Sequence, residues 1–292
     1  MGGRNTVVIG VANGYGAANP ACQDGPEVLR SLRFLSDLEE NRNCFHWDAP
    51  IRNRQLVAGD SLGAVEDIAS QLAARVRSYV QEGSFPLVIG GDHSCAIGTW
   101  SGVKRVLDAE ARLGLIWIDA HMDSHTFGSS PSQQIHGMPL ACLLGVGDRR
   151  LTDIAGAGAK LLPQDVCLIG VRSFESEEAA LLEKLGVRIF FMDEIRRRGL
   201  HAVLVEALAL VRRRTAGYGI SIDLDVLDPV EEPGVGSPVP GGLLRADLTA
   251  ALHLAHGDDR LLALEIVEYN PYLDEHFVTA HAIHDLCQSL VP

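Results

Sequence analysis

The sequence has 292 residues, of which 47% are hydrophobic, and a formal net charge of −13. Such a chain can bury a large core, but it has no run near the roughly 20 apolar residues that a membrane span needs and no pattern typical of a secretion signal. Because phosphate binding relies on clustered Lys and Arg, the acidic balance argues against a nucleic-acid partner, and we expect a soluble, cytoplasmic protein.

Short β-branched runs alternate with longer helical patterns along the chain. We expect strands over 6–11, 44–47, 86–90, 113–118, 166–171, 187–191, 218–222 and 262–267. Helical patterns lie between most of them, including one that opens at Gly25 and one that follows a cap at Asp60 or Ser61. Continuous apolar strands with helical crossovers predict a mostly parallel sheet of about eight strands, covered on both faces. No linker or repeat interrupts the pattern, so we expect residues 1–292 to form a single three-layer α/β/α domain.

The six cysteines and two arginine runs lie outside this regular pattern. No CxxC spacing links the cysteines, and most of them lie in apolar runs, which is typical of reduced, buried thiols. The arginine runs at 196–198 and 212–214 flank one predicted helix. Solvated helix ends are the simpler interpretation of these runs, and a contact between subunits is the alternative.

The most informative stretch is residues 117–125, where an apolar run stops and polar side chains alternate. Asp119, His121 and Asp123 occupy every second position, so on an extended backbone they point to the same side. Such a comb of chelating side chains requires further ligands from elsewhere in the chain.

Other polar residues follow strands in a similar way. His93 comes just after one expected strand. Asp223 and Asp225 end a second strand, and Glu268 ends a third. Since parallel sheets bind ligands beyond the carboxyl ends of their strands, we expect these segments and the comb to converge on one site.

The candidate ligands are therefore two histidines and four aspartates. This set is rich in hard oxygen donors and has no thiolate, which favours Mn²⁺ over zinc or an iron–sulfur cluster. Four clustered carboxylates would repel one another without metal, whereas two divalent ions neutralise them. Each residue alone could have a structural role, as an aspartate that caps a helix or a buried histidine whose hydrogen bonds are made. Six such residues at three strand ends instead favour two metal ions. His281 and His284 lack a carboxylate motif alongside, which favours a structural or surface role.

Five motifs give a resemblance to a known family. They are Gly90-Gly91-Asp92-His93-Ser94, Asp119-Ala120-His121-Met122-Asp123, His136-Gly137-Met138-Pro139, Ser221-Ile222-Asp223-Leu224-Asp225 and Glu268-Tyr269-Asn270-Pro271. In this order they resemble the ureohydrolase family of arginases and agmatinases, most closely its arginase branch. The stretches Val8-Ile9-Gly10 and Gly25-Pro26-Glu27 are similar to that family's first strand and first helix, so the resemblance spans nearly the whole chain.

The resemblance implies a hydrolase with two manganese ions per subunit. The first ion would be held by His93, Asp119, Asp123 and Asp223. The second would be held by His121, Asp119, Asp223 and Asp225, so that Asp119 and Asp223 bridge the two. A hydroxide between the ions would attack the guanidinium carbon and release urea and an amine.

The resemblance also implies roles for three catalytic residues. Glu268 would orient the planar guanidinium through charge-assisted hydrogen bonds. Asp123 or His136 would supply the proton that the leaving amine needs. His136 would act as an outer shuttle, because an unperturbed imidazole titrates near neutrality.

Three positions of the expected substrate pocket favour L-arginine, which would give L-ornithine and urea. In the arginase branch a serine four residues before the histidine helps to bind the substrate carboxylate, and Ser132 matches it. Glu175 falls where that branch places an acidic residue toward the substrate α-amino group. Ser237 lies where a hydroxyl side chain is expected near Glu268.

The same pocket departs from the arginase pattern. Arginases usually carry Asn two residues after the comb as a carboxylate contact, but this chain has His125, which differs from an amide in length and titration. Gln133 and Gln134 also replace the usual small residue and Asn. Another guanidino acid, such as 4-guanidinobutyrate, or agmatine is therefore an alternative substrate.

Two further interpretations use the same fold. Zinc-dependent amide deacetylases use one metal, and the complete pair of bridging aspartates argues against them. A non-catalytic binding protein would be expected to lack a ligand, whereas all six ligands are present. The resemblance also implies a homo-oligomer, a trimer or hexamer, that binds a small cationic guanidino compound.

Overall fold

The protein is described by a computed structural model over residues 4–41, 45–54 and 59–291. Eight strands form one sheet in the order β2-β1-β3-β8-β7-β4-β5-β6, and every neighbouring pair is parallel. They are β1 (Thr6–Gly10), β2 (Phe45–Trp47), β3 (Phe85–Ile89), β4 (Leu113–Ile118), β5 (Val166–Val171), β6 (Arg188–Phe191), β7 (Gly217–Asp223) and β8 (Leu261–Val267). All eight expected strands are confirmed, except that residue 44 lies outside the described ranges.

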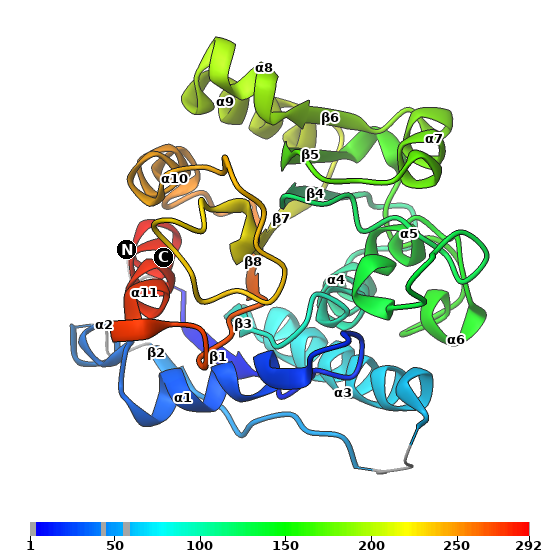
Figure 1. Cartoon of the computed structure of the whole chain (residues 1–292). Coiled ribbons are helices and arrows are strands. Elements are labelled where there is room, and N and C mark those ends of the chain that lie inside the picture. The colour runs from blue at the N-terminus through cyan, green and yellow to red at the C-terminus, as the bar shows by residue number, and fades with distance from the viewer. Residues whose placement is uncertain (1–3, 42–44, 55–58, 292) are drawn as a thin grey trace.

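Helices cover both faces of the sheet and complete the expected three layers (Figure 1). One face packs against α3 (Ser61–Gln81), α4 (Cys95–Val106), α5 (Pro139–Leu143) and α7 (Ser176–Leu185). The other packs against α1 (Gly25–Ser31), α8 (Met192–Arg198), α9 (Leu200–Arg212), α10 (Arg245–Leu252) and α11 (Val278–Leu290). The short helices α2 (Ser36–Asn41) and α6 (Arg149–Thr152) lie in the connections. The predicted cap of α3 is confirmed, because the Asp60 side chain accepts a hydrogen bond from the Gly63 N–H at 2.8 Å.

The strands are buried on both faces because their apolar side chains alternate between two cores. In β4, Ile116 and Ile118 pack into one core, whereas Leu115 and Trp117 pack into the other. This period of two explains why the strand reads as a continuous apolar run in the sequence. Each buried methylene contributes about 0.8 kcal/mol, so the two cores supply most of the driving force for this arrangement.

The register of the central strands brings their carboxyl ends to one level. Ile118 of β4 pairs with Ile222 of β7, and Asp223 pairs with Val267 of β8. On the other side of β8, Ile266 pairs with Ile89 of β3. The residues that follow these four strands therefore share one edge of the sheet, as the sequence predicts.

Two further expectations concern the cysteines and the membrane. The described cysteines are buried free thiols, as predicted: Cys22, Cys95, Cys142, Cys167 and Cys287. The sixth cysteine, Cys44, lies outside the described residues. Within the described ranges, no helix has both the length and the apolar character required to cross a bilayer.

Candidate metal centre and active site

The first cluster forms around His93, which lies in the turn between β3 and α4. Its Nδ1 atom lies 3.3 Å from an oxygen of Asp119, 3.0 Å from one of Asp123 and 3.1 Å from one of Asp223. This nitrogen is buried and makes no hydrogen bond among the described residues. Donor atoms about 3 Å apart match the edge of an octahedron around an ion with bonds of about 2.1 Å. The predicted ligands of the first ion are therefore brought together in a geometry that fits a shared cation.

The second cluster adjoins the first through Asp119. His121 Nδ1 lies 3.0 Å from an oxygen of Asp225 and 3.6 Å from Oδ1 of Asp119, whereas Oδ2 of Asp119 faces His93. Asp119 thus turns one oxygen toward each histidine, as a bridging ligand would. Asp223 is not part of this second group, and its Oδ1 accepts a hydrogen bond from the Asp225 N–H at 2.9 Å. Its expected role as the second bridge stays a prediction.

Buried neighbours fix the orientation of His93. Its Nε2 lies 3.1 Å from the Ser221 hydroxyl, which donates to Glu265 at 2.7 Å. The imidazole stacks on Trp117 with ring centroids 4.1 Å apart, and the indole N–H donates to Asp119 at 2.8 Å. The sequence prediction missed Ser221 and Glu265 as site residues. The sequence feature that could have identified them is that each is a polar side chain within a largely apolar strand.

The electrostatics of the two clusters require added positive charge. Burial, reinforced by the charge of Asp119, raises the pKa of Asp123 to about 6. Burial and the nearby Asp225 carboxylate also raise the pKa of Asp223. Burial alone would lower the pKa of His121, but the charges and hydrogen bonds of Asp225 and Asp119 outweigh it and raise that pKa. Divalent cations would replace the protons that these groups otherwise retain, so the donor set fits metal binding.

Glu268 lies beside the first cluster in a strained conformation. Its φ angle is +68° and that of Asp123 is +47°, a region that side chains other than glycine seldom adopt. Glu268 Oε1 accepts a hydrogen bond from the His93 N–H at 2.9 Å and lies 3.0 Å from His136 Nδ1. Burial alone would lower the pKa of His136, but Glu268 raises it to about 10. The contact with Glu268 thus raises the pKa of this imidazole above its unperturbed value, which the motif alone did not indicate.

A cavity of about 160 Å³ opens onto the two clusters. Most of the predicted site residues line it: His121, Asp123, His125, Ser132, His136, Glu175, Asp223, Asp225 and Ser237. The others, His93, Asp119 and Glu268, contact residues of this lining. Segments that are far apart in the sequence thus meet at one site at the carboxyl edge.

The lining also includes Glu178, which the sequence prediction missed. Glu178 lies in the first turn of α7, and its two oxygens accept hydrogen bonds from the Ser124 N–H and the Glu175 N–H, each at 3.1 Å. Burial raises the pKa of its carboxyl group to about 8. An acidic residue three positions into a helix is a common capping feature, so its sequence position did not distinguish it as a site residue.

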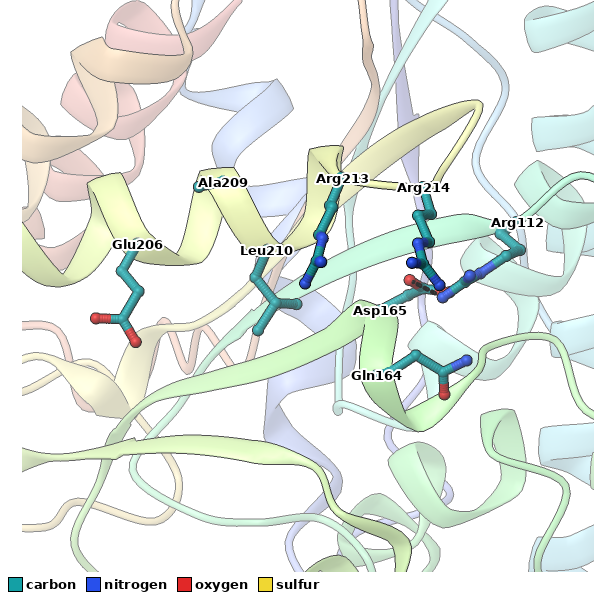
Figure 2. A pocket seen from close by; sticks show the side chains of 8 residues that line it. All are labelled: Arg112, Gln164, Asp165, Glu206, Ala209, Leu210, Arg213 and Arg214. Atoms are coloured by element: carbon teal, nitrogen blue, oxygen red, sulfur yellow. Dashed lines mark hydrogen bonds and ion pairs between the residues drawn. The ribbon is translucent and has the colours of Figure 1, made fainter.

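A larger cavity, of about 490 Å³, lies at the opposite, amino edge of the sheet (Figure 2). The Arg112 guanidinium donates two hydrogen bonds of 2.5 Å to Asp165 in its wall. Arg213 and Arg214, from the second arginine run, also line it, and their side chains are exposed and unpaired with respect to the described residues. Its lining residues include no histidine beside a carboxylate, so we place the chemistry at the smaller cavity.

Fold and site together define a metal-dependent hydrolase of the parallel α/β/α class. The profile of the Arginase family matches residues 4–291. Arginase from Bacillus caldovelox is 41% identical over 295 residues, which cover 97% of this chain and 96% of the relative. The chain belongs to the Arginase family.

Solved structures agree with this assignment. A native structure of Bacillus caldovelox arginase superposes with a TM-score of 0.92 at 40% identity and covers 99% of this chain and 98% of its own. Entamoeba histolytica arginase in complex with L-ornithine superposes with a TM-score of 0.90 at 30% identity, with 99% of both chains covered. The predicted fold class is therefore confirmed.

Proposed function

We propose that this protein hydrolyses L-arginine to L-ornithine and urea at a centre of two Mn²⁺ ions. The observation that carries the proposal is the environment of His93 Nδ1, a buried nitrogen that faces three aspartate oxygens and makes no hydrogen bond to a described residue. Membership of the Arginase family supports the reaction, because arginases match this chain over nearly its whole length.

Six residues would hold the metals: His93, Asp119, His121, Asp123, Asp223 and Asp225. Their donor atoms are mostly carboxylate oxygens, which suits Mn²⁺. The position of Asp119 between the two histidines supports two ions rather than one, and so favours this function over a single-metal amide deacetylase. When bound, the ions would lower the pKa of water so that it can attack the guanidinium carbon at neutral pH.

Asp123, His136 and Glu268 would manage the proton and the substrate cation. Asp123 lines the cavity beside both clusters and would hold the proton that the attacking water releases. His136 binds Glu268 through Nδ1, and its side chain is 25% exposed, so its Nε2 would deliver a proton to the leaving amine. Glu268 uses Oε1 for His93 and His136, which leaves Oε2 to orient the guanidinium.

The other end of the cavity would bind the amino-acid head group. Ser132, Glu175, Ser237 and His125 all line it, which supports a substrate that extends beyond its guanidinium. The ornithine complex of the Entamoeba relative supports an amino acid as product. Agmatine and 4-guanidinobutyrate are the alternative substrates, because His125, Gln133 and Gln134 depart from the arginase pattern.

We further propose that residues 1–292 form one domain and that the protein acts in the cytoplasm as a trimer or hexamer. The single continuous sheet supports one domain. The buried free thiols suit a reducing compartment. The oligomer is inferred from the family resemblance.

The proposed function predicts urea release that depends on metal. Protein dialysed against a chelator should release no urea from L-arginine, and two equivalents of Mn²⁺ per chain should restore turnover. Metal content measured by mass spectrometry should follow the recovery. Full activity in rigorously metal-free protein would contradict the proposal, as would the absence of urea from every guanidino compound tested with two ions bound.

A further inference from the structure

We infer that His125 and Glu175 make the outer end of the active-site cavity selective for an ammonium group, so that the substrate carboxylate is not required for binding. The inference rests on the proposed function and names its substrate class. That class comprises guanidino compounds with a free amino group at the other end, both L-arginine and agmatine.

Both ring nitrogens of His125 are already engaged. The side chain is 8% exposed, and its backbone N–H donates to the Gly137 carbonyl at 2.9 Å. Ser129 Oγ accepts the Thr126 N–H at 3.0 Å and lies 3.1 Å from Nδ1 of His125. Nε2 of the imidazole lies 3.1 Å from Glu175. Each ring nitrogen thus already faces a protein partner, so neither is free to donate to a substrate carboxylate.

Glu175 is held in place but still accessible. Its backbone N–H donates to Glu178, which also accepts the N–H of Ser124 directly after the metal-binding comb. This link fixes Glu175 relative to the metal ligands. Its side chain is 55% exposed, and its contacts with His125 and with the backbone N–H of Glu178 leave further lone pairs of the carboxylate available. An ammonium in the cavity can therefore bind to Glu175 without displacing His125.

The charge of the cavity favours the same ligand. Among the described residues, its lining has five carboxylates and no Lys or Arg. Three of them are assigned to the metals, and Glu178 is buried with a raised pKa, so the exposed carboxylate of Glu175 makes the outer end acidic. A substrate carboxylate placed there would be repelled and would find chiefly the hydroxyls of Ser132 and Ser237 as donors. Ser132 Oγ already accepts the Gln134 N–H at 3.3 Å.

The first test compares three substrates of the Mn²⁺-loaded protein. L-arginine and agmatine should have kcat/KM values within about tenfold of each other, whereas 4-guanidinobutyrate should be lower by about 10-fold to 100-fold, the range expected for a lost hydrogen bond to a charged group. Calorimetry with the products gives an independent readout, since putrescine should bind about as well as ornithine. A preference for L-arginine over agmatine of about a thousandfold or more would overturn the inference.

Variants then assign the selectivity to particular residues. Glu175→Gln should raise KM about tenfold for L-arginine and agmatine, with kcat little changed, and should leave 4-guanidinobutyrate almost unaffected. Glu177→Gln is the charge-matched control, because Glu177 lies in the same helical turn and contacts Ser176 rather than the cavity. His125→Asn should shift the preference toward L-arginine about fivefold or more, because the amide adds a donor for the carboxylate.

The outcomes separate the inference from the proposed function. Circular dichroism of each variant confirms that it is folded. Equal losses with all three substrates in Glu175→Gln, or an unchanged preference in His125→Asn, would overturn the inference while urea release still supports the proposed function. Absence of urea from all three substrates with both metals bound would overturn both.

Discussion

The two edges of the parallel sheet handle charge in opposite ways. At the amino edge, acids and bases pair directly, as Arg112 does with Asp165 and Arg212 with Asp258. At the carboxyl edge, four aspartates crowd around two histidines, and one histidine nitrogen makes no hydrogen bond to a described residue. These two ion pairs balance their charges without an added ion. The crowded edge becomes electrostatically balanced when cations bind, and this difference distinguishes a structural ion pair from a functional site.

The largest of the expected effects tests the crowded edge. His136→Asn removes the imidazole that bonds to Glu268 and reaches the cavity. Because a positioned proton donor contributes about 10²-fold to 10⁴-fold, turnover should fall about a hundredfold or more while both metals stay bound. Steady-state urea release and metal analysis of the same sample measure the two quantities. Turnover equal to that of the native protein across neutral pH would exclude His136 as the proton donor.

The paired edge should show the reverse behaviour. Asp165→Asn leaves the Arg112 guanidinium beside an amide, so the free energy of unfolding should fall by about 2 kcal/mol. Turnover per folded molecule should not change, because this pair lies at the other end of β4 and β5. Chemical denaturation monitored by fluorescence gives the first quantity and urea release gives the second.

Arg214→Ala provides the matched control for this variant. Arg214 lines the same cavity without an ion pair to a described residue, so its removal should change the free energy of unfolding by less than about 0.5 kcal/mol. An equal loss of stability in the two variants would show that the Arg112–Asp165 pair has no special role. A fall in turnover in Asp165→Asn would contradict the separation of the two edges.

The sequence predicted the parts of the fold and site that depend on local pattern. Apolar runs with helical crossovers identified the eight strands, and polar residues at the strand ends identified all six candidate ligands. The order of the strands could not be predicted, because it depends on which helix packs on which face. Glu178 and Glu265 were missed for a related reason. Their roles arise from contacts with Ser124 and Ser221, which lie 54 and 44 residues away in the chain.

The pKa of His136 shows the same limit at a single residue. The sequence identified the imidazole, but its bond to Glu268 is a contact between residues 132 positions apart. That contact outweighs burial and raises the pKa to about 10. A motif can thus single out a histidine as a candidate catalytic residue, whereas the pKa of that histidine depends on a tertiary neighbour.

The smallest of the expected effects concerns a histidine that is paired in the ordinary way. His284 on α11 lies 2.8 Å from Asp37 on α2 and 3.3 Å from Asp285. Burial alone would lower the pKa of His284, but the hydrogen bonds and charges of these acids outweigh it and raise the pKa. Because the folded-state pKa is raised, the charged histidine stabilises the protein fully at pH values below its unfolded-state pKa of about 6.5. This stabilisation is lost as the pH rises through the folded-state pKa. Since Asp37 is half exposed, we expect a contribution of only about 0.5 kcal/mol.

Comparison of His284→Ala with His281→Ala isolates this contribution. His281 lies on the same helix and contacts the ring of Phe34 edge-on, without an ion pair to a described acid. His284→Ala should lower the melting temperature at pH 6, and the loss should shrink as pH is raised past the folded-state pKa. His281→Ala should not show the loss at pH 6 that comes from the pairing of His284 with Asp37, because the ring contact of His281 with Phe34 involves no acid. The same pH dependence in both variants would show that the pairing with Asp37 does not stabilise the fold. An acid–base pair would then not be stabilising merely because it lies outside the metal centre, unlike the pairs expected at the amino edge.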